Sequence, residues 1–407
     1  MNEAGIISAP AGPLPLGQLR TVFRDLLVGF RQAVNAAGQH TATFRIGGQH
    51  VQLRSAGTAP LAVFGAALEH LRLPAPARAD VAICVFAGGA AGDFPALPPP
   101  GVYVALRSGL QMTVTAQPAA VTAYDPRVRL GMAWLAGDPW EHERAYAAPL
   151  REVLAAAMRP QGLMGLHAAA VGNEHGGALL AGAGGAGKST TAVACALAGM
   201  HFAGEDFCLV QSAPGPEAAP VAFSLYSSAK LVPSSLAWLQ PPAAAATGRS
   251  VDGKHVYLLP RAPGLQVVEQ LPLRAVIVLQ ITGAGPSRLC ATTPVAAINA
   301  LAPTSVRLMG LPAQAAAAGF HSAAALVRQV RCYRLELGAD VLATPALGNL
   351  AARVLEDAHP PPALHLLPRD ERTNARGGWP RAVSLRPPLW PWLLAAAGAL
   401  LLASRRT

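Results

Sequence analysis

One eight-residue segment constrains the fold of this chain more than any other. Residues 182–189 read Gly-Ala-Gly-Gly-Ala-Gly-Lys-Ser and match the pattern GxxxxGK[ST] in full. The apolar run 178–181 precedes the segment, and a helix is predicted over 188–198 after it. A glycine-rich loop between a buried strand and a helix N-terminus lets successive backbone N–H groups surround a phosphate, and the helix dipole adds positive potential there. The segment therefore predicts an α/β fold with a phosphate-binding loop.

The residue types in this loop indicate a nucleoside triphosphate with Mg²⁺, and ATP is the predicted ligand. The Lys188 ammonium would reach the β- and γ-phosphates, and the Ser189 hydroxyl would bind Mg²⁺. The chain has no NKxD-like element for reading guanine and no LSGGQ-like signature, so GTPases and ABC ATPases are disfavoured. The residues predicted to contact the nucleotide are Gly182, Ala183, Gly184, Gly185, Ala186, Gly187, Lys188, Ser189 and Thr190, with Lys230 and Lys254.

Lysine is rare in this sequence, which makes its positions informative. Only three of the 32 basic residues are lysines, namely Lys188, Lys230 and Lys254, and all three lie in the middle third of the chain. A lysine offers a compact charge on a flexible stem, which suits contact with a phosphate. We therefore expect Lys230 and Lys254 to face the same cleft as Lys188, with chance retention as the alternative.

An acidic pair follows the predicted loop helix. Glu205 and Asp206 stand 17 and 18 residues after Lys188, within a predicted strand-turn-strand over 201–211. Because one helix and one turn use up this distance, the pair should return to the edge of the phosphate site. Adjacent carboxylates there could hold Mg²⁺, directly or through water, and accept a proton from an attacking hydroxyl. We assign Asp206, with Ser189, to the metal; the alternative for the pair is a solvated turn.

His167 is a further candidate on geometric grounds. If the apolar strand 166–171 pairs antiparallel with 178–181, residue 167 falls opposite Gly182. That register would place an imidazole beside the phosphates. A lone histidine in an apolar strand is otherwise a core residue, and the sequence leaves both interpretations open.

These segments together resemble a known family. Residues 166–171 (Leu-His-Ala-Ala-Ala-Val), the loop ending Gly-Lys-Ser-Thr, and residues 203–207 (Ala-Gly-Glu-Asp-Phe) are similar to the kinase core of HPr kinase/phosphorylase. They are more closely similar to the diverse HPr kinase-like bacterial proteins, which share ancestry with phosphoenolpyruvate carboxykinases. Residues 224–231 and 332–338 carry the same resemblance, which extends over about 165–340.

The resemblance implies ATP, Mg²⁺ and a serine hydroxyl on a protein or peptide as phosphoryl acceptor. It also implies that His167 lies near the phosphates and that Glu205 and Asp206 act as base and metal ligand, in an order that stays open. The sequence departs from the family in three ways. The pair is Glu-Asp instead of Asp-Asp, Thr190 stands where true HPr kinases have Glu, and their later glycine-rich signature has no match. Phosphorylase activity, and HPr itself as substrate, are therefore not expected.

The predicted function is ATP-dependent phosphorylation of a hydroxyl group. Two alternatives stay open, because the sequence indicates a donor site and no acceptor site. One is a small-molecule kinase on the same scaffold. The other is a non-catalytic nucleotide-binding accessory protein in the assembly of a cell-surface product.

The chain as a whole predicts an α/β kinase core, of mixed sheet flanked by helices, behind a smaller domain. In the latter, helices are predicted over 22–37 and 59–71, and Gly47-Gly48 predicts a hairpin joining 41–45 to 50–54. A helix over 141–158 leads into the core, whose apolar run 275–279 predicts a central strand. The predicted domains are an N-terminal α/β or α+β domain over 1–150, the kinase domain over 151–358, a Pro/Arg-rich linker over 359–388 and an apolar tail over 389–407.

Composition narrows the partners and the compartment. The net charge is +10, but the basic residues are scattered arginines without a dense run or interleaved aromatics, so nucleic acid is not an expected partner. Five dispersed cysteines without a CxxC pair favour reduced thiols, and residues 1–15 lack the features of a secretory signal. These features predict a cytoplasmic protein.

The tail leaves three interpretations open. Residues 389–403 carry no charge, are flanked by arginines and include Trp390 and Trp392 where an interfacial aromatic belt would lie. This stretch is shorter than the roughly 20 residues of a full span. It is therefore a short membrane anchor, a helix on the protein or in the interface, or an appendage. An anchor would hold the kinase domain at the inner face of the membrane. Oligomeric state is also open, with a homo-oligomer among the options.

Overall fold

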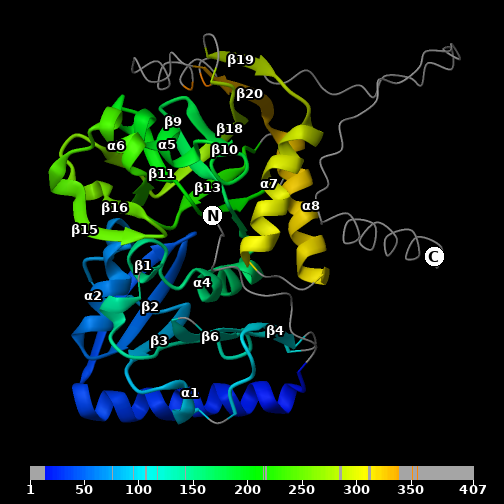
Figure 1. Cartoon of the computed structure of the whole chain (residues 1–407). Coiled ribbons are helices and arrows are strands. Elements are labelled where there is room, and N and C mark those ends of the chain that lie inside the picture. The colour runs from blue at the N-terminus through cyan, green and yellow to red at the C-terminus, as the bar shows by residue number, and fades with distance from the viewer. Residues whose placement is uncertain are drawn as a thin grey trace, which may run out of the picture. The chain divides into compact units, whose positions relative to one another are not determined.

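The computed structural model describes residues 14–338, apart from 76, 95, 106–107, 117, 143, 214, 216–217, 284–286 and 310–312, and also Ala351 and Leu355. The chain divides into two compact units, Met1–Ala358 and His359–Thr407, and every described residue belongs to the first. That unit is α/β, with mixed sheets flanked by helices (Figure 1). The predicted linker and tail lie outside the described residues. None of the described helices is both long and apolar enough to cross a membrane.

The described N-terminal residues form a seven-stranded mixed sheet in the order β1-β2-β3-β7-β6-β5-β4. The predicted hairpin is confirmed, because β1 and β2 pair antiparallel around Gly47 and Gly48, both with positive φ. Pairs β2–β3 and β3–β7 are parallel, and the others are antiparallel. The strands are β1 (Gln39–Ile46), β2 (Gln49–Ala56), β3 (Val81–Ala87), β4 (Gly101–Ala105), β5 (Leu110–Ala116), β6 (Ala119–Asp125) and β7 (Leu130–Leu135).

Helices cover both faces of this sheet (Figure 1). Helix α1 (Leu16–Ala37) contains the predicted helix 22–37 and buries one stripe of apolar side chains, including Leu19, Val22 and Leu26, with helical spacing. These pack with Phe86 and its neighbours, while alternate strand residues face the opposite side. That side is covered by α2 (Thr58–Ala66) and α4 (Arg151–Met158).

Two helix predictions need correction. The continuous helix predicted over 141–158 is wrong, because the chain turns sharply before α4. Pro149 disfavours helical backbone in the residue before it, and Leu150 takes a left-handed φ of 56°. The helix predicted over 59–71 is also too long, because a 3-10 turn replaces its last part. The elements observed are η3 (Pro139–Glu141), α3 (Arg144–Ala147) and α4, and for the second prediction α2 followed by η1 (Glu69–Leu71).

A ten-stranded mixed sheet forms the centre of the rest of the described chain. Its main order is β17-β11-β9-β10-β18-β13-β12-β8, with β20 beside β18 and β19 beside β20. The prediction of a central strand over 275–279 is confirmed, since β18 pairs with β10, β13 and β20. The strands are β8 (Met164–Leu166), β9 (Ala169–Asn173), β10 (Gly176–Ala181), β11 (His201–Gly204), β12 (Cys208–Gln211), β13 (Val221–Ser224), β17 (Gln266–Val267), β18 (Gln270–Ile281), β19 (Arg288–Ala291) and β20 (Arg331–Leu337).

This sheet is buried on both faces, which explains its continuous apolar strands. Leu180 packs with α5 (Lys188–Leu197) on one face, whereas Leu179 packs with α7 (Pro294–Met309) and α8 (Ala313–Gln329) on the other. A small antiparallel sheet has the strand order β14-β16-β15. Its strand β14 packs against α5, and helix α6 also contacts α5. Their bounds are β14 (Ser228–Leu231), α6 (Pro233–Leu239), β15 (Ala246–Val251) and β16 (Lys254–Leu258).

The segment between β13 and β14 bonds to the N-terminal residues. Ser227 donates from its backbone N–H and its hydroxyl to the Ala67 carbonyl, at 2.9 and 3.1 Å. The Tyr226 hydroxyl donates to the Pro149 carbonyl at 2.7 Å, and the Ser228 hydroxyl donates to the Ala147 carbonyl. Leu225, Tyr226 and Phe207 also share one apolar core with Leu68, Leu71 and Leu154. The two large sheets are therefore joined by both apolar and polar contacts.

One contact in this region predicts acid sensitivity. His70 Nε2 lies 2.7 Å from the Ser224 hydroxyl, and burial lowers the pKa of His70 from 6.5 to about 4. Between pH 6.5 and about 4, the unfolded chain therefore binds a proton at His70 that the folded chain does not bind. Stability should fall as pH falls from 6.5 to about 4 and be unaffected by this group above 6.5. Urea unfolding across this range should show a shallower dependence for His70→Gln; equal slopes for both proteins would contradict the assignment.

Candidate functional site

The glycine-rich loop of residues 182–187 connects β10 to α5, in the strand-loop-helix context that the sequence predicts. Gly182 and Gly187 have φ values of 154° and 94°. A Cβ atom on Gly182 would lie 2.8 Å from Cβ of Ala186, so a larger residue cannot take its place without displacement. Ala183, Gly184 and Gly185 are exposed at the top of the loop. The loop thus presents backbone to solvent immediately before the N-terminus of α5.

Lys188 is the first residue of α5, and its side chain bends back over the loop. Nζ donates to the carbonyls of Gly182 and Ala183 at 2.8 and 3.1 Å, and only 7% of the residue is exposed. Burial lowers the pKa of Lys188, and the carboxylates Asp206 and Glu205 oppose this shift. The ammonium is therefore electrostatically coupled to both predicted acids.

The two acids occupy the turn at which the chain changes partners in the ten-stranded sheet. Strand β11 pairs with β9, whereas β12 pairs with β13 and β8 in another part of the sheet. Gly204, with a φ of 150°, ends β11, and Glu205 and Asp206 follow at the change. Because the chain changes strand partners here, these two residues are not paired in either strand. The predicted return of the acids to the loop region agrees with their coupling to Lys188.

His167 lies at a second change of partners. The predicted register is confirmed, since Leu180 pairs with Ala169 and Leu179 pairs with Ala170. The continuous strand over 166–171 is wrong, however, because β8 pairs instead with β12 and His167 lies between β8 and β9. His167 Nε2 consequently lies 3.2 Å from Oδ1 of Asp206 instead of extending the β9–β10 ladder to Gly182.

Lys230 on β14 organises both acids. Its Nζ lies 2.6 Å from Oδ2 of Asp206, and its backbone N–H donates to Oε1 of Glu205 at 2.9 Å. Burial raises the pKa of Asp206, but the Lys230 ammonium and the hydrogen bond from His167 outweigh it, so the pKa lies well below its ordinary range. Asp206 is therefore ionised at neutral pH.

Glu205 has the opposite character. It is 2% exposed, and burial raises its pKa although Lys230 opposes the shift. The Ser189 hydroxyl faces this carboxylate and lowers its pKa. The second carboxylate oxygen, Oε2, is buried and has no hydrogen-bond partner of normal geometry among the described residues. One acid is thus held as an anion while the other keeps a proton-accepting oxygen without a fixed partner.

The two other predicted contacts differ in their surroundings. Lys254 begins β16 after the turn at Asp252 and Gly253, and its charge acts on Lys188. The structure thus brings Lys254 to the same cluster. The Thr190 hydroxyl lies 2.8 Å from the Ser235 hydroxyl of α6, where it links α5 to α6.

Sequence reasoning missed Arg151, the first residue of α4. It pairs with Glu152 at 2.8 Å and interacts electrostatically with Asp206 and Lys230. The predicted continuous helix over 141–158 hid it, and only Pro149 signalled the sharp entry to α4. Among the described residues, this cluster contains four cations and three carboxylates, and the excess of positive charge favours an anionic ligand. The cations are Lys188, Lys230, Lys254 and Arg151, and the carboxylates are Glu152, Glu205 and Asp206.

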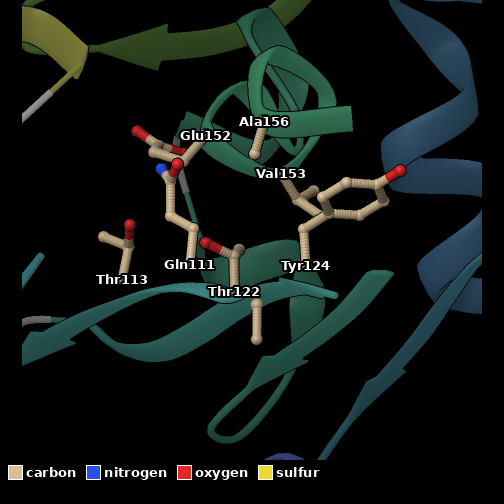
Figure 2. A pocket seen from close by; sticks show the side chains of 8 residues that line it. Gln111, Thr113, Thr122, Tyr124, Glu152, Val153 and Ala156 are labelled. Atoms are coloured by element: carbon tan, nitrogen blue, oxygen red, sulfur yellow. The ribbon is translucent and has the colours of Figure 1, made fainter. Parts of the chain in front are cut away.

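A shallow depression with no room for a water molecule lies between α4 and strands β5 and β6 (Figure 2). It contains none of the residues predicted from the sequence, and Figure 2 shows Glu152 and Val153 above Gln111 and Thr122. Across the described ranges, no three His, Cys, Asp or Glu side chains are grouped closely enough to hold a metal ion by themselves.

No protein-family model matches this chain, and no curated protein matches it. We therefore infer the function from the geometry and charge of the cluster itself.

Proposed function

We propose that this protein is an ATP-dependent kinase built on a P-loop kinase core. It transfers the γ-phosphoryl group to a hydroxyl, and we propose a serine of a protein or peptide as acceptor. One observation carries the proposal: the loop lysine Lys188 and the acidic turn Glu205–Asp206 belong to a single electrostatic cluster. A cation and an acidic pair beside a glycine-rich helix N-terminus are the parts that phosphoryl transfer needs.

The loop supplies groups suited to a triphosphate. Loop N–H groups and the N-terminus of α5 favour an anion. The Lys188 ammonium donates to two neutral carbonyls, and charged phosphate oxygens accept stronger hydrogen bonds than these. Binding would therefore draw the ammonium from the loop backbone to the phosphates.

The residues present also fit Mg²⁺. This ion takes one or two protein oxygens and completes its octahedron with water and phosphate, so it does not need three carboxylates. The Ser189 hydroxyl faces Glu205, and ionised Asp206 follows Glu205 in the same turn as a hard oxygen donor. Ser189 and Asp206 would hold the ion, which supplies charge neutralisation at the β- and γ-phosphates.

Glu205 is the better candidate for the base. A base must be able to take a proton, and burial gives the Glu205 carboxylate a higher proton affinity than that of Asp206. The acceptor O–H proton would pass to Oε2, while the acceptor oxygen bonds to the γ-phosphorus. The bond between that phosphorus and the β–γ bridging oxygen breaks, and ADP leaves.

The test is ATP turnover by the purified chain with Mg²⁺ and candidate acceptors. Incorporation of label from γ-labelled ATP into serine would support the proposal. Saturable ATP binding without turnover would instead support a nucleotide-binding accessory protein. Phosphoproteomics of cells with the intact chain against a Lys188 variant would identify the acceptor.

Replacing Lys230 with Arg should lower turnover although the charge is retained. A planar guanidinium cannot reproduce the point contact of Nζ with Oδ2 of Asp206. We expect a loss of roughly tenfold, the equivalent of one hydrogen bond. Lys254→Arg is the matched control, since no hydrogen bond to a described residue fixes its ammonium, and it should lose less. Steady-state turnover of both variants decides this; equal effects would argue against a special contact at Lys230.

A further inference from the structure

We propose that Arg151 is a further cation of this site and contacts the phosphoryl group during transfer. The inference rests on the proposed function and extends it. Arg151 is brought to the site by the segment that enters α4 from the N-terminal sheet. Arginines in this role stabilise the charge that spreads over the equatorial oxygens of the transferring group.

The backbone before Arg151 is fixed relative to Lys230. The Tyr226 hydroxyl bonds to the Pro149 carbonyl, and the Ser228 hydroxyl bonds to the Ala147 carbonyl. Both donors lie within four residues of Lys230 on the same segment. Lys230 in turn contacts both acids. The same segment therefore fixes the position of residues 147–149 relative to the acidic turn.

The turn itself is strained and held. Leu150 has a left-handed φ of 56°, a conformation that non-glycine residues rarely adopt. Its side chain is buried in the shared core, and its carbonyl accepts the first hydrogen bond of α4, from Leu154 N–H at 2.9 Å. Such strain persists where the surroundings determine the conformation, and it is common at functional sites. Here it starts the helix at Arg151.

The environment of the guanidinium suits an additional anion. Arg151 is 13% exposed in its side chain, and Nη2 lies 2.8 Å from Oε1 of Glu152. Nε is buried and has no hydrogen-bond partner in the part of the chain that the structure describes. A buried cation held by one carboxylate gives little net stability compared with an apolar side chain. An arginine with a spare donor that also interacts electrostatically with Asp206 instead fits a planar array of phosphoryl oxygens.

Glu152 is the carboxylate that pairs with the guanidinium directly. Glu152 borders the shallow depression over β5 and β6, on the side of α4 that faces the sheet (Figure 2). Arg151 is attracted by Glu152 first and by Asp206 next. The guanidinium thus interacts with a carboxylate of α4 and with one of the acidic turn.

The experiment measures binding of ADP with Mg²⁺ and aluminium fluoride, which mimics the transferring group and needs no acceptor. ATP affinity and the thermal unfolding midpoint are measured beside it. Arg151→Gln should weaken binding of the ADP–aluminium fluoride complex by roughly 10³-fold, the lower end of arginine contributions to this chemistry. ATP affinity should change little, because the contact forms during transfer. The affinity of Arg151→Lys for the aluminium fluoride complex should lie between those of the unaltered chain and Arg151→Gln.

Arg159→Gln is the matched control. Arg159 is another partly buried arginine, close in sequence just after α4, and it donates to Gln111 of the N-terminal sheet. It should leave the aluminium fluoride complex unchanged. Wild-type binding by Arg151→Gln, or an equal loss in Arg159→Gln, would overturn the inference while leaving the proposed function intact. If Arg151→Gln unfolds, wild-type binding by Arg151→Lys would overturn it instead. If the unaltered chain binds no ATP, the proposed function fails first and the inference with it.

Discussion

Lys188→Ala should weaken ATP binding by about a hundredfold, because it removes charge-assisted hydrogen bonds to the phosphates. The ammonium is buried at the loop and already donates two hydrogen bonds there, so no long-range movement is needed to meet a ligand. Turnover should fall further, because the same charge acts on the transferring phosphoryl group. Isothermal calorimetry with ATP and Mg²⁺ measures the first effect, and product formation measures the second.

Loss of the loop's own structure has to be separated from loss of the cation. Lys188→Met keeps a long side chain but removes both loop hydrogen bonds, so its unfolding midpoint reports their contribution to stability. If Lys188→Ala and Lys188→Met fold normally and bind ATP as tightly as the unaltered chain, the glycine-rich loop is not a phosphate site. The proposed function would then have no donor site.

Changing the two acids should separate their roles. Glu205→Gln should leave ATP affinity close to normal but lower turnover by about 10²–10⁴-fold, the usual contribution of a general base. Asp206→Asn should remove the dependence on Mg²⁺ together with transfer, because a neutral amide is a weaker Mg²⁺ ligand. It also breaks the ion pair with Lys230. Metal titrations followed by turnover measurements distinguish these outcomes.

Asp125→Asn is the matched control for the acidic turn. Asp125 is a buried carboxylate paired with Arg127 at 2.7 Å in the seven-stranded sheet, so the change removes an ion pair outside the site. It should cost stability and leave turnover unchanged. Full activity in both Glu205→Gln and Asp206→Asn would mean that the two acids form a structural turn.

Local sequence signals predicted the elements that local physics determines. The glycine doublet at 47–48 specifies a hairpin because both positions need positive φ. Likewise, the apolar run at 275–279 specifies a strand buried on both faces, and β18 lies between neighbours on each side. The spacing from Lys188 to Glu205 predicted their proximity, because a helix and an antiparallel return leave the chain little choice.

The missed features depend on contacts between distant segments. The place of His167 is set by β8 leaving its neighbour β9 and pairing with β12, and no pattern within residues 166–171 encodes that exchange. Arg151 depends on a left-handed leucine that the surrounding core holds in place. Periodicity treated that stretch as one helix, because its apolar spacing continues through the turn. The role of the tail over 389–407 stays a prediction.

The hydrogen bonds of the segment between β13 and β14 also bear on how the chain can be divided. A fragment beginning at residue 151 would lose the carbonyls of Ala67, Ala147 and Pro149, which accept from this segment. It would also expose Leu225 and Phe207, whose apolar partners lie partly in the removed half. Truncation there would leave hydrogen-bond donors near Lys230 without their acceptors and would expose an apolar surface that favours aggregation. We therefore expect that the half that carries the acidic turn does not fold by itself.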